Sequence, residues 1–302
     1  MSTKICEGRV VIVTGAGRGI GRAHALAFAR QGARVIVNDL GTALDGRDPS
    51  ETPAQAVVDE ILAFGGEAIT DGEDVAHWEG GGRMVAKAIE RWGRLDVVVN
   101  NAGIVRDRMF VSATEEEWDA VIRVHLKGHF CVSRHAAAYW RAQVKAGHTV
   151  DARIINTSSG AGLLGSIGQS AYGAAKAGIT ALTLMQAAEL SRYGVTANAI
   201  APAARTRMTE GAFADMMKKP DSGFDAMDPA NVSPLVVWLG STDASDVTGQ
   251  VFELSGGQIS VAEGWHQGPT VDKGQRWAPS EVGSAVRRLL KDARPASKVY
   301  GT

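Results

Sequence analysis

The chain has 302 residues and a formal net charge of −1, with 45% hydrophobic and 22% charged residues. This composition provides for a large core and excludes a disordered chain, and so small a net charge gives no electrostatic basis for nucleic acid or an anionic membrane as a partner. The sequence has no apolar run of the roughly 18–20 residues that cross a bilayer. It shows no secretory leader, and Cys6 and Cys131 form no disulfide framework, so we expect a cytoplasmic protein without a membrane span.

Short β-branched runs alternate with helical patterns along the chain. Strands are predicted at residues 10–13, 33–38, 68–71, 95–100, 153–158, 196–201 and 251–254. Several of these runs are apolar at consecutive positions, which indicates strands buried on both faces, as in a parallel sheet. Helices are predicted at residues 20–30, 55–64 and 172–190, and a capping box of Thr114 and Glu117 predicts the start of another. We expect an α/β fold of the Rossmann type, with a doubly wound parallel sheet of about seven strands flanked by helices.

Three stretches interrupt this regular pattern. Residues 41–53 form a long polar loop, residues 206–229 are rich in Met and Phe, and residues 258–302 form a tail. The apolar loop could close over a lipid-like substrate or make an ordinary core or subunit contact. We place a dinucleotide-binding catalytic domain at residues 1–257. The C-terminal extension, residues 258–302, is expected to pack on the same domain or on a neighbouring subunit.

A glycine-rich turn follows the first predicted strand. It reads Thr14-Gly15-Ala16-Gly17-Arg18-Gly19-Ile20-Gly21 and has the spacing T-G-x-x-x-G-x-G. Here a strand must turn sharply into a helix, and side chains would prevent the backbone amides from approaching a pyrophosphate. A glycine-rich turn without a ligand is the alternative. The predicted cofactor-binding residues in this turn are Gly15, Arg18, Gly19, Ile20 and Gly21.

Further cofactor contacts are predicted at the ends of later strands. Asp39 follows the second strand, where a carboxylate would bind the adenosine ribose and repel a 2′-phosphate, so NAD is favoured over NADP. Arg18 and Arg34 argue for NADP, because an arginine could accept that phosphate; a solvated loop aspartate is the third interpretation. The other predicted cofactor contacts are Asp74, Val75, Asn101, Ala102, Gly103, Tyr172, Lys176, Pro202 and Thr206.

Tyr172 and Lys176 stand at i and i+4 of a predicted helix, so both project from one face. A phenol with a pKa near 10 is a poor acid–base at neutral pH, and a neighbouring ammonium, with the positive nicotinamide ring, would lower that pKa. Ser159 lies thirteen residues before Tyr172 at the end of a predicted strand, where its hydroxyl could bind the substrate oxygen. Ser158 would point to the other side of the strand, and we favour a structural role for it.

The order of these motifs, together with Asn100-Asn101-Ala102-Gly103, resembles the short-chain dehydrogenase/reductase family from about residue 8 to residue 257. The resemblance implies that Tyr172 is the acid–base, that Lys176 lowers its pKa and holds the ribose, and that Ser159 orients the substrate. It also implies an NAD(H)-dependent oxidoreductase that acts on a secondary alcohol or ketone and assembles as a homodimer or homotetramer.

One position departs from the family pattern. The family has an asparagine in V-N-x-x-G, whereas this chain reads Val124-His125-Leu126-Lys127-Gly128. An imidazole also donates and accepts hydrogen bonds, so His125 could take part in a proton relay; a core histidine bonded to the backbone is the alternative. His125 and His129 have the spacing of a helical zinc pair, but no third ligand group is visible, so we expect no metal.

Further details resemble one branch of the family. Residues 37–41, the run NNAGIVRDR at 100–108 and Arg207-Met208-Thr209 look like the (3R)-hydroxyacyl-CoA dehydrogenase part of peroxisomal multifunctional enzymes and its bacterial single-domain relatives. This implies a 3-hydroxyacyl-CoA or a hydroxysteroid as substrate, in lipid or sterol breakdown. An NADPH-dependent 3-oxoacyl (ACP/CoA) reductase is the alternative enzyme, and a non-catalytic binding protein of the same fold is the second alternative. Candidates for binding a CoA phosphate are Arg106, Arg108, Lys218 and Lys219.

Overall fold

The computed structural model describes residues 4–41, 52–206 and 217–300, and across these ranges the chain forms one eight-stranded sheet. The strands are β1 (Val10–Thr14), β2 (Arg34–Asn38), β3 (Glu67–Asp71), β4 (Val97–Asn100), β5 (Ala152–Thr157), β6 (Val195–Ala203), β7 (Val251–Ser255) and β8 (Gln258–Val261). They lie in the order β3-β2-β1-β4-β5-β6-β7-β8, and β1 to β7 are parallel. The predicted doubly wound α/β fold is therefore confirmed.

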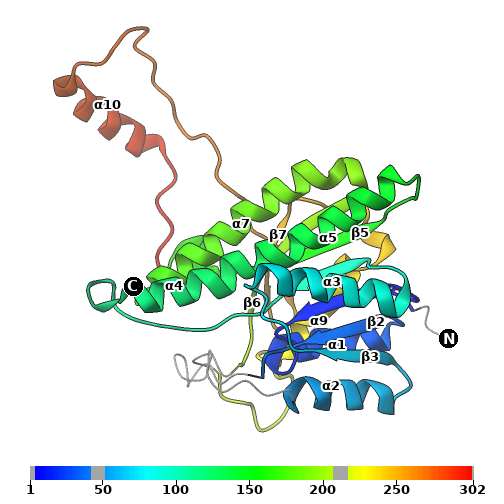
Figure 1. Ribbon diagram of the computed structural model, residues 1–302. Coiled ribbons are helices and arrows are strands. Elements are labelled where there is room, and N and C mark those ends of the chain that lie inside the picture. Colours follow the sequence, from blue (N-terminus) through cyan, green and yellow to red (C-terminus); the bar gives the residue numbers. More distant parts are fainter. Residues whose placement is uncertain (1–3, 42–51, 207–216, 301–302) are drawn as a thin grey trace.

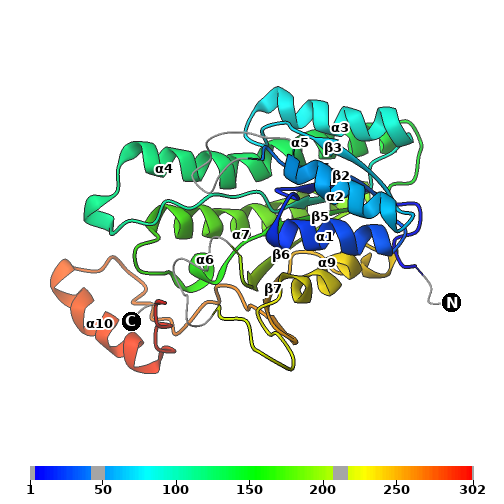
Figure 2. The ribbon, with the colours of Figure 1, turned by 90° about the horizontal axis from the view of Figure 1, so that it is seen from below.

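Helices cover both faces of the sheet (Figures 1 and 2). The α-helices are α1 (Gly19–Arg30), α2 (Thr52–Ala63), α3 (Trp78–Trp92), α4 (Glu115–Ile122), α5 (Gly128–Lys145), α6 (Gly160–Leu164), α7 (Ser170–Leu190), α9 (Ser233–Leu239) and α10 (Pro279–Asp292). Val11 and Val13 of β1 pack in one core with α1, α2 and α9. Val10 and Ile12 pack in a second core with α3, α5 and α7. Consecutive apolar residues are thus buried on opposite faces, as predicted.

The predicted capping box of Thr114 and Glu117 is present at the start of α4. The helical path continues beyond α4 through a π-helical turn, Arg123–Lys127, into α5. The predicted loop at 41–53 falls mainly outside the described residues, as does the part of the apolar loop at 207–216. Of the remainder of that apolar loop, Met217 is buried and Phe224 is exposed.

The sheet contains one strand more than the predicted seven. β8 pairs antiparallel with β7 through a turn at Gly256 and Gly257, so the first residues of the expected C-terminal extension belong to the sheet. A two-glycine turn is a hairpin signal, but the strand that follows it has only four residues, and all are exposed. Residues 258–261 therefore lack the buried apolar pattern that predicts the other strands.

After β8 the chain leaves the body of the molecule, forms α10 and returns (Figures 1 and 2). No residue of α10 is buried. The returning end forms a parallel bridge between Tyr300 and Ser166. Within the described ranges, no helix combines the length and apolarity required to cross a membrane.

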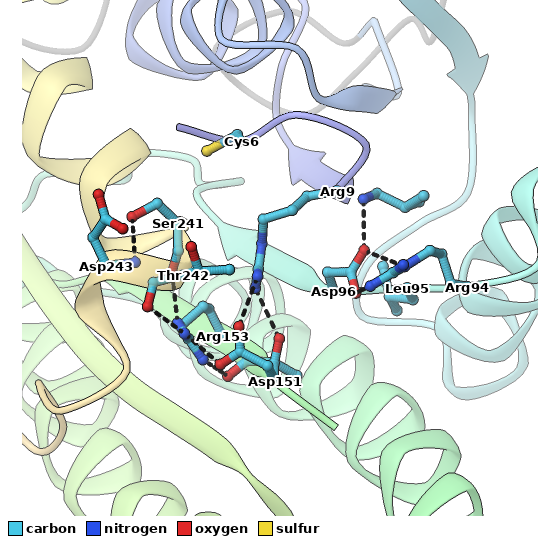
Figure 3. Close-up of polar contacts among 12 residues, drawn as sticks. Cys6, Arg9, Arg94, Leu95, Asp96, Asp151, Arg153, Ser241, Thr242 and Asp243 are labelled. Atoms are coloured by element: carbon cyan, nitrogen blue, oxygen red, sulfur yellow. Dashed lines mark hydrogen bonds and ion pairs between the residues drawn. The ribbon is translucent and has the colours of Figure 1, made fainter. Parts of the chain in front are cut away.

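A polar cluster joins β1, β4 and β5 at the edge of the sheet where these strands begin (Figure 3). Arg9 donates to the carboxylate and to the carbonyl oxygen of Asp151, both at 2.9 Å. Arg153, which is 1% exposed, pairs with the same carboxylate. Asp96 accepts the backbone N–H of Val10 at 2.8 Å. These contacts fix the sheet at the end opposite to the candidate site.

Candidate active site

The loops that follow the strands open into a cavity of about 470 Å³ at the carboxyl edge of the sheet. All the predicted cofactor residues line it, as does His125: Gly15, Arg18, Gly19, Ile20, Gly21, Asp39, Asp74, Val75, Asn101, Ala102, Gly103, Tyr172, Lys176, Pro202 and Thr206. The fold therefore brings together residues from positions 15 to 206 of the chain. Ser158 also lines the cavity, whereas Ser159, the next residue, lies behind Tyr172, whose pKa it affects.

The glycine turn leaves no room for a side chain at Gly15, Gly17 or Gly21. A methyl group on Gly21 would lie 2.2 Å from the carbonyl oxygen of Gly15, and one on Gly17 would lie 2.8 Å from a carboxylate oxygen of Asp39. Gly15 itself has a positive φ of 61°, which favours glycine. The turn leads into the N-terminus of α1, where backbone N–H groups attract an anion. These residues fit the pyrophosphate of a dinucleotide.

A contact between β1 and β4 supports this turn, and the sequence alone did not reveal it. The Thr14 hydroxyl accepts the backbone N–H groups of Asn101 and Ala102, at 2.9 and 3.1 Å. The Asn101 side chain donates in return to the carbonyl oxygens of Thr14 and Gly15, at 3.0 and 3.2 Å. The side chain of Asn101 thus holds the glycine turn.

Asp39 follows β2 and accepts the N–H of Gly17 at 2.8 Å and the N–H of Gly41 at 2.6 Å. Its carboxylate is therefore fixed beside the glycine turn. Arg34 lies at the other end of β2, in register with Val10, and pairs with Glu67 at 3.4 Å. Arg34 lies too far along β2 to reach the cavity. Of the two arginines that favoured NADP in the sequence, Arg18 lines the cavity and Arg34 does not.

Tyr172 and Lys176 project from α7 beside Ser159, which begins α6 and accepts the N–H of Ala161 at 3.2 Å. The Lys176 ammonium donates to the carbonyl oxygen of Thr157 at 2.6 Å and lies 5.5 Å from the centroid of the Tyr172 ring. The predicted acid–base pair and the predicted serine are thus adjacent. The sequence did not single out Thr157, because a backbone acceptor leaves no signature in residue type.

Burial controls the protonation of both groups. It lowers the pKa of Lys176 from 10.5 to about 7. Burial also raises the pKa of Tyr172, and the neighbouring Ser159 hydroxyl opposes this shift. Desolvation penalises the phenolate and the ammonium alike, and the effect of Lys176 on the pKa of Tyr172 stays a prediction.

Ser158 and Ser159 have different partners. The Ser158 hydroxyl donates to the carbonyl oxygen of Lys176 and is hydrogen-bonded to the Thr180 hydroxyl, both at 2.9 Å. These contacts attach β5 to α7. The Ser159 hydroxyl accepts the N–H of Ala161 at the start of α6 and lies near enough to Tyr172 to oppose the rise in the pKa of its phenol.

His125 lies in the π-helical turn, and its ring meets the Tyr172 ring edge-on at 5.2 Å between centroids. Its Nε2 lies 3.1 Å from the backbone nitrogen and 2.7 Å from the carbonyl oxygen of Ile104. Its Nδ1 is buried and has no hydrogen-bond partner among the described residues. Burial lowers the pKa of His125 to about 3, and the charge of Lys176 adds to this shift. The ring is therefore neutral at neutral pH. It is bonded to the backbone, as expected of a core histidine, and it lies beside Tyr172, as expected of a relay residue.

His129, four residues after His125, accepts the backbone N–H of Thr157 at 3.4 Å. The structure thus gives this imidazole a partner in β5. Within the described ranges, no group of three or more His, Cys, Asp or Glu side chains is arranged to hold a metal ion.

The fold and the cavity are those of a dinucleotide-binding protein, and the predicted acid–base pair, Tyr172 and Lys176, lines that cavity. A family model described as short chain dehydrogenase matches residues 9–216, and the chain belongs to this family. It is therefore an oxidoreductase with a nicotinamide cofactor, as the sequence predicted.

Named relatives and a solved structure agree with this assignment. The Hydroxyacyl-CoA dehydrogenase ChsB1 of Mycobacterium tuberculosis is 45% identical, over 100% of this chain and 94% of that protein. The Peroxisomal multifunctional enzyme type 2 of Mus musculus is 44% identical over 84% of this chain, which matches 32% of that protein. A crystal structure of a short chain dehydrogenase from Mycobacterium avium has a TM-score of 0.89 and 62% identity, covering 99% of this chain and 100% of that one.

Proposed function

We propose that this enzyme uses NAD(H) to interconvert a lipid-like secondary alcohol and its ketone, with a 3-hydroxyacyl-CoA or a hydroxysteroid as substrate. The observation that carries the proposal is the juxtaposition of Ser159, Tyr172 and Lys176 at the end of a dinucleotide cavity. The substrate class is supported by the names of relatives, which describe a hydroxyacyl-CoA dehydrogenase and a peroxisomal multifunctional enzyme.

In alcohol oxidation the Tyr172 oxygen accepts the hydroxyl proton, and the Ser159 hydroxyl orients the same substrate oxygen. NAD, when held by the glycine turn and Asp39, would supply the acceptor for the hydride of the carbinol carbon. Lys176 gives one N–H to Thr157, and its other donors are available for a ribose hydroxyl. In the reverse direction Tyr172 returns the proton to the ketone oxygen. Because burial raises the pKa of Tyr172, alcohol oxidation also requires that the phenol release its own proton to solvent before it accepts the proton of the substrate.

NAD is favoured over NADP because the fixed Asp39 carboxylate borders the cavity. A 2′-phosphate beside this carboxylate would face like-charge repulsion. Arg106 lines the cavity, whereas Arg108 does not. Arg106 is therefore the better candidate for contacting a CoA phosphate.

A test of this proposal compares wild type with Tyr172→Phe on acetoacetyl-CoA, a series of longer 3-oxoacyl-CoA thioesters and oxosteroids. We expect wild-type turnover with NADH to exceed that with NADPH by at least about tenfold, or about 1.4 kcal/mol. Loss of the phenol hydroxyl removes the acid–base, so we expect turnover to fall by at least about 100-fold while NADH binding, followed by fluorescence, persists.

Each alternative predicts a different result in the same assay. A wild type that prefers NADPH on acetoacetyl thioesters is the 3-oxoacyl reductase. Cofactor binding without turnover on any substrate supports the non-catalytic protein. Full activity of Tyr172→Phe contradicts the assigned chemistry.

We further propose a homo-oligomer, dimer or tetramer, that covers the outer face of α7. Seven side chains of α7 are solvent-exposed in the single chain. Six are apolar (Ala174, Ala177, Ala181, Leu184, Met185 and Ala188), and the seventh is Glu189 near the end of the helix. A helix that exposes such a continuous apolar stripe is expected to pack against another surface. Light scattering that finds only monomer would contradict this assembly.

Both cysteines are buried free thiols, which is compatible with the expected cytoplasmic location.

A further inference from the structure

The end of the chain is attached to the segment that carries Ser159. The backbone N–H of Tyr300 donates to Gly165 at 3.2 Å, and its carbonyl oxygen accepts the N–H of Ile167 at 3.1 Å. Figures 1 and 2 show that the chain reaches this point after the excursion through α10. About forty residues therefore separate β8 from a contact beside the catalytic centre.

Tyr300 and Val299 contact both ends of α6. A methyl group on Gly160, the residue after Ser159, would lie 2.8 Å from the phenol oxygen of Tyr300, and one on Gly165 would lie 3.4 Å from Val299. On its other side α6 packs on α7, because a methyl group on Gly162 would lie 2.6 Å from the backbone of Lys176. The helix that begins at Ser159 is thus held between α7 and the C-terminal segment.

An apolar surface surrounds this contact. Leu164, Ile167, Val299 and Tyr300 are 37%, 48%, 38% and 45% exposed. A second backbone connection, from Arg108 N–H to the Gly168 carbonyl oxygen at 2.8 Å, brings in a further exposed apolar group. That group consists of Met109, Phe110 and Val111. We call these seven side chains the apolar rim.

We infer that the apolar rim is the binding surface for the hydrocarbon part of the substrate, and that Tyr300 is a specificity-determining residue within it. None of the seven side chains lines the cavity itself, but the rim borders α6, which begins directly after Ser159. The inferred path of the hydrocarbon leads from Ser159 and Tyr172 along α6 to the rim. Burial of hydrocarbon against these side chains favours longer substrates. A four-carbon acyl group ends near the reacting carbon and gains nothing from the rim. The inference rests on the proposed function, and it adds the place where the acyl chain lies.

The first test measures kcat and KM for acetoacetyl-CoA and 3-oxohexadecanoyl-CoA in wild type and in Tyr300→Ala. We expect kcat/KM for the long substrate to fall by about tenfold, through KM, because one wall of an apolar site is lost. The value for acetoacetyl-CoA should stay within about twofold of wild type. Tyr300→Phe keeps the ring and should behave as wild type, and so should Leu290→Ala, which removes an exposed apolar side chain from α10.

A second test uses Gly160, whose φ is not in the left-handed region and whose three nearest neighbours for an added methyl group all belong to Tyr300. Gly160→Ala should displace the ring and reproduce the loss on the long substrate. In the Tyr300→Ala background the same substitution should have no further effect. An added loss there would mean that Gly160→Ala acts on Ser159 directly and would contradict the inference.

Other outcomes overturn it as well. An equal loss on both substrates would show that Tyr300 acts through α6 and not on the hydrocarbon. No loss on either would remove Tyr300 from the site. A changed assembly mass in Tyr300→Ala would assign the rim to a second copy of the chain. Failure of the proposed function is distinguishable, because the wild type would then turn over neither thioester.

Discussion

At the scale of single residues, His125 shows how one side chain combines packing and polarity. One ring nitrogen is bonded to the Ile104 backbone, and the other is buried with no partner among the described residues. A buried polar atom left without a partner costs free energy, so its retention suggests a task. The ring is edge-on to Tyr172 and lines the cavity. The proton relay that the sequence offered for His125 stays a prediction.

The relay predicts a specific pattern of variants. His125→Phe keeps a ring of similar shape against Tyr172 but removes both nitrogens, and we expect kcat to fall by at least about tenfold. His125→Asn restores a group that donates and accepts, and it should recover most of the rate. Steady-state kinetics, with melting temperature as a control for folding, make the comparison. Equal activity of the Phe variant and wild type would leave His125 a core residue only.

At the scale of elements, the sheet has a functional edge and a structural edge. The cavity lies beyond the ends of β1, β4 and β5, after Thr14, Asn100 and Thr157. The arginine–aspartate cluster lies where these strands begin (Figure 3). The carboxylate of Asp151 forms ion pairs with two buried guanidinium groups, those of Arg9 and Arg153. Breaking such an arrangement leaves charge buried without compensation.

Asp151→Asn should therefore destabilise the fold without altering the site. We expect a loss on the order of 3 kcal/mol in the free energy of unfolding, measured by urea denaturation. Glu7→Gln removes the carboxylate of an exposed ion pair with Lys4 and should change stability by less than about 1 kcal/mol. KM values for cofactor should be unchanged in both variants. Similar small losses in the two variants would show that solvent at the partly exposed Asp151 screens the cluster.

At the scale of the whole molecule, three buried imidazoles link folding to pH. His24, His125 and His129 are 0%, 1% and 2% exposed. Burial lowers the pKa of His24 and of His125 from 6.5 to about 3, and that of His129 well below 6.5. Between these values the unfolded chain binds protons that the folded chain does not, so stability is lost as the pH falls from about 6.5 toward 3.

His24 provides a test of this linkage away from the site. Its Nδ1 is hydrogen-bonded to the Ser233 hydroxyl at 3.0 Å, between α1 and α9. His24→Asn keeps an amide for that contact but cannot titrate. Its loss of stability between pH 6.5 and about pH 4.5 should be smaller than that of wild type, by on the order of 2 kcal/mol. Denaturation at several pH values measures this, and parallel curves for the two proteins would refute the role of His24.

The sequence by itself determined the features that depend on local order. Consecutive apolar residues predicted a parallel sheet buried on both faces, and the glycine turn and the i, i+4 spacing of Tyr172 and Lys176 positioned the cavity. These signals are local because strand and helix periods and turn chemistry act over a few residues. The short, exposed β8 has no such period, and its two-glycine turn was the one local signal that could have revealed it.

Only the tertiary structure decided which groups meet and how they titrate. It attached Ser158 to Lys176 and Thr180, and it placed Arg34 away from the cavity. Burial, which depends on residues distant in the chain, raises the pKa of Tyr172. It also brought Tyr300 against Gly160. Contacts between distant segments, and the desolvation they cause, follow no local pattern and arise only when the chain is packed.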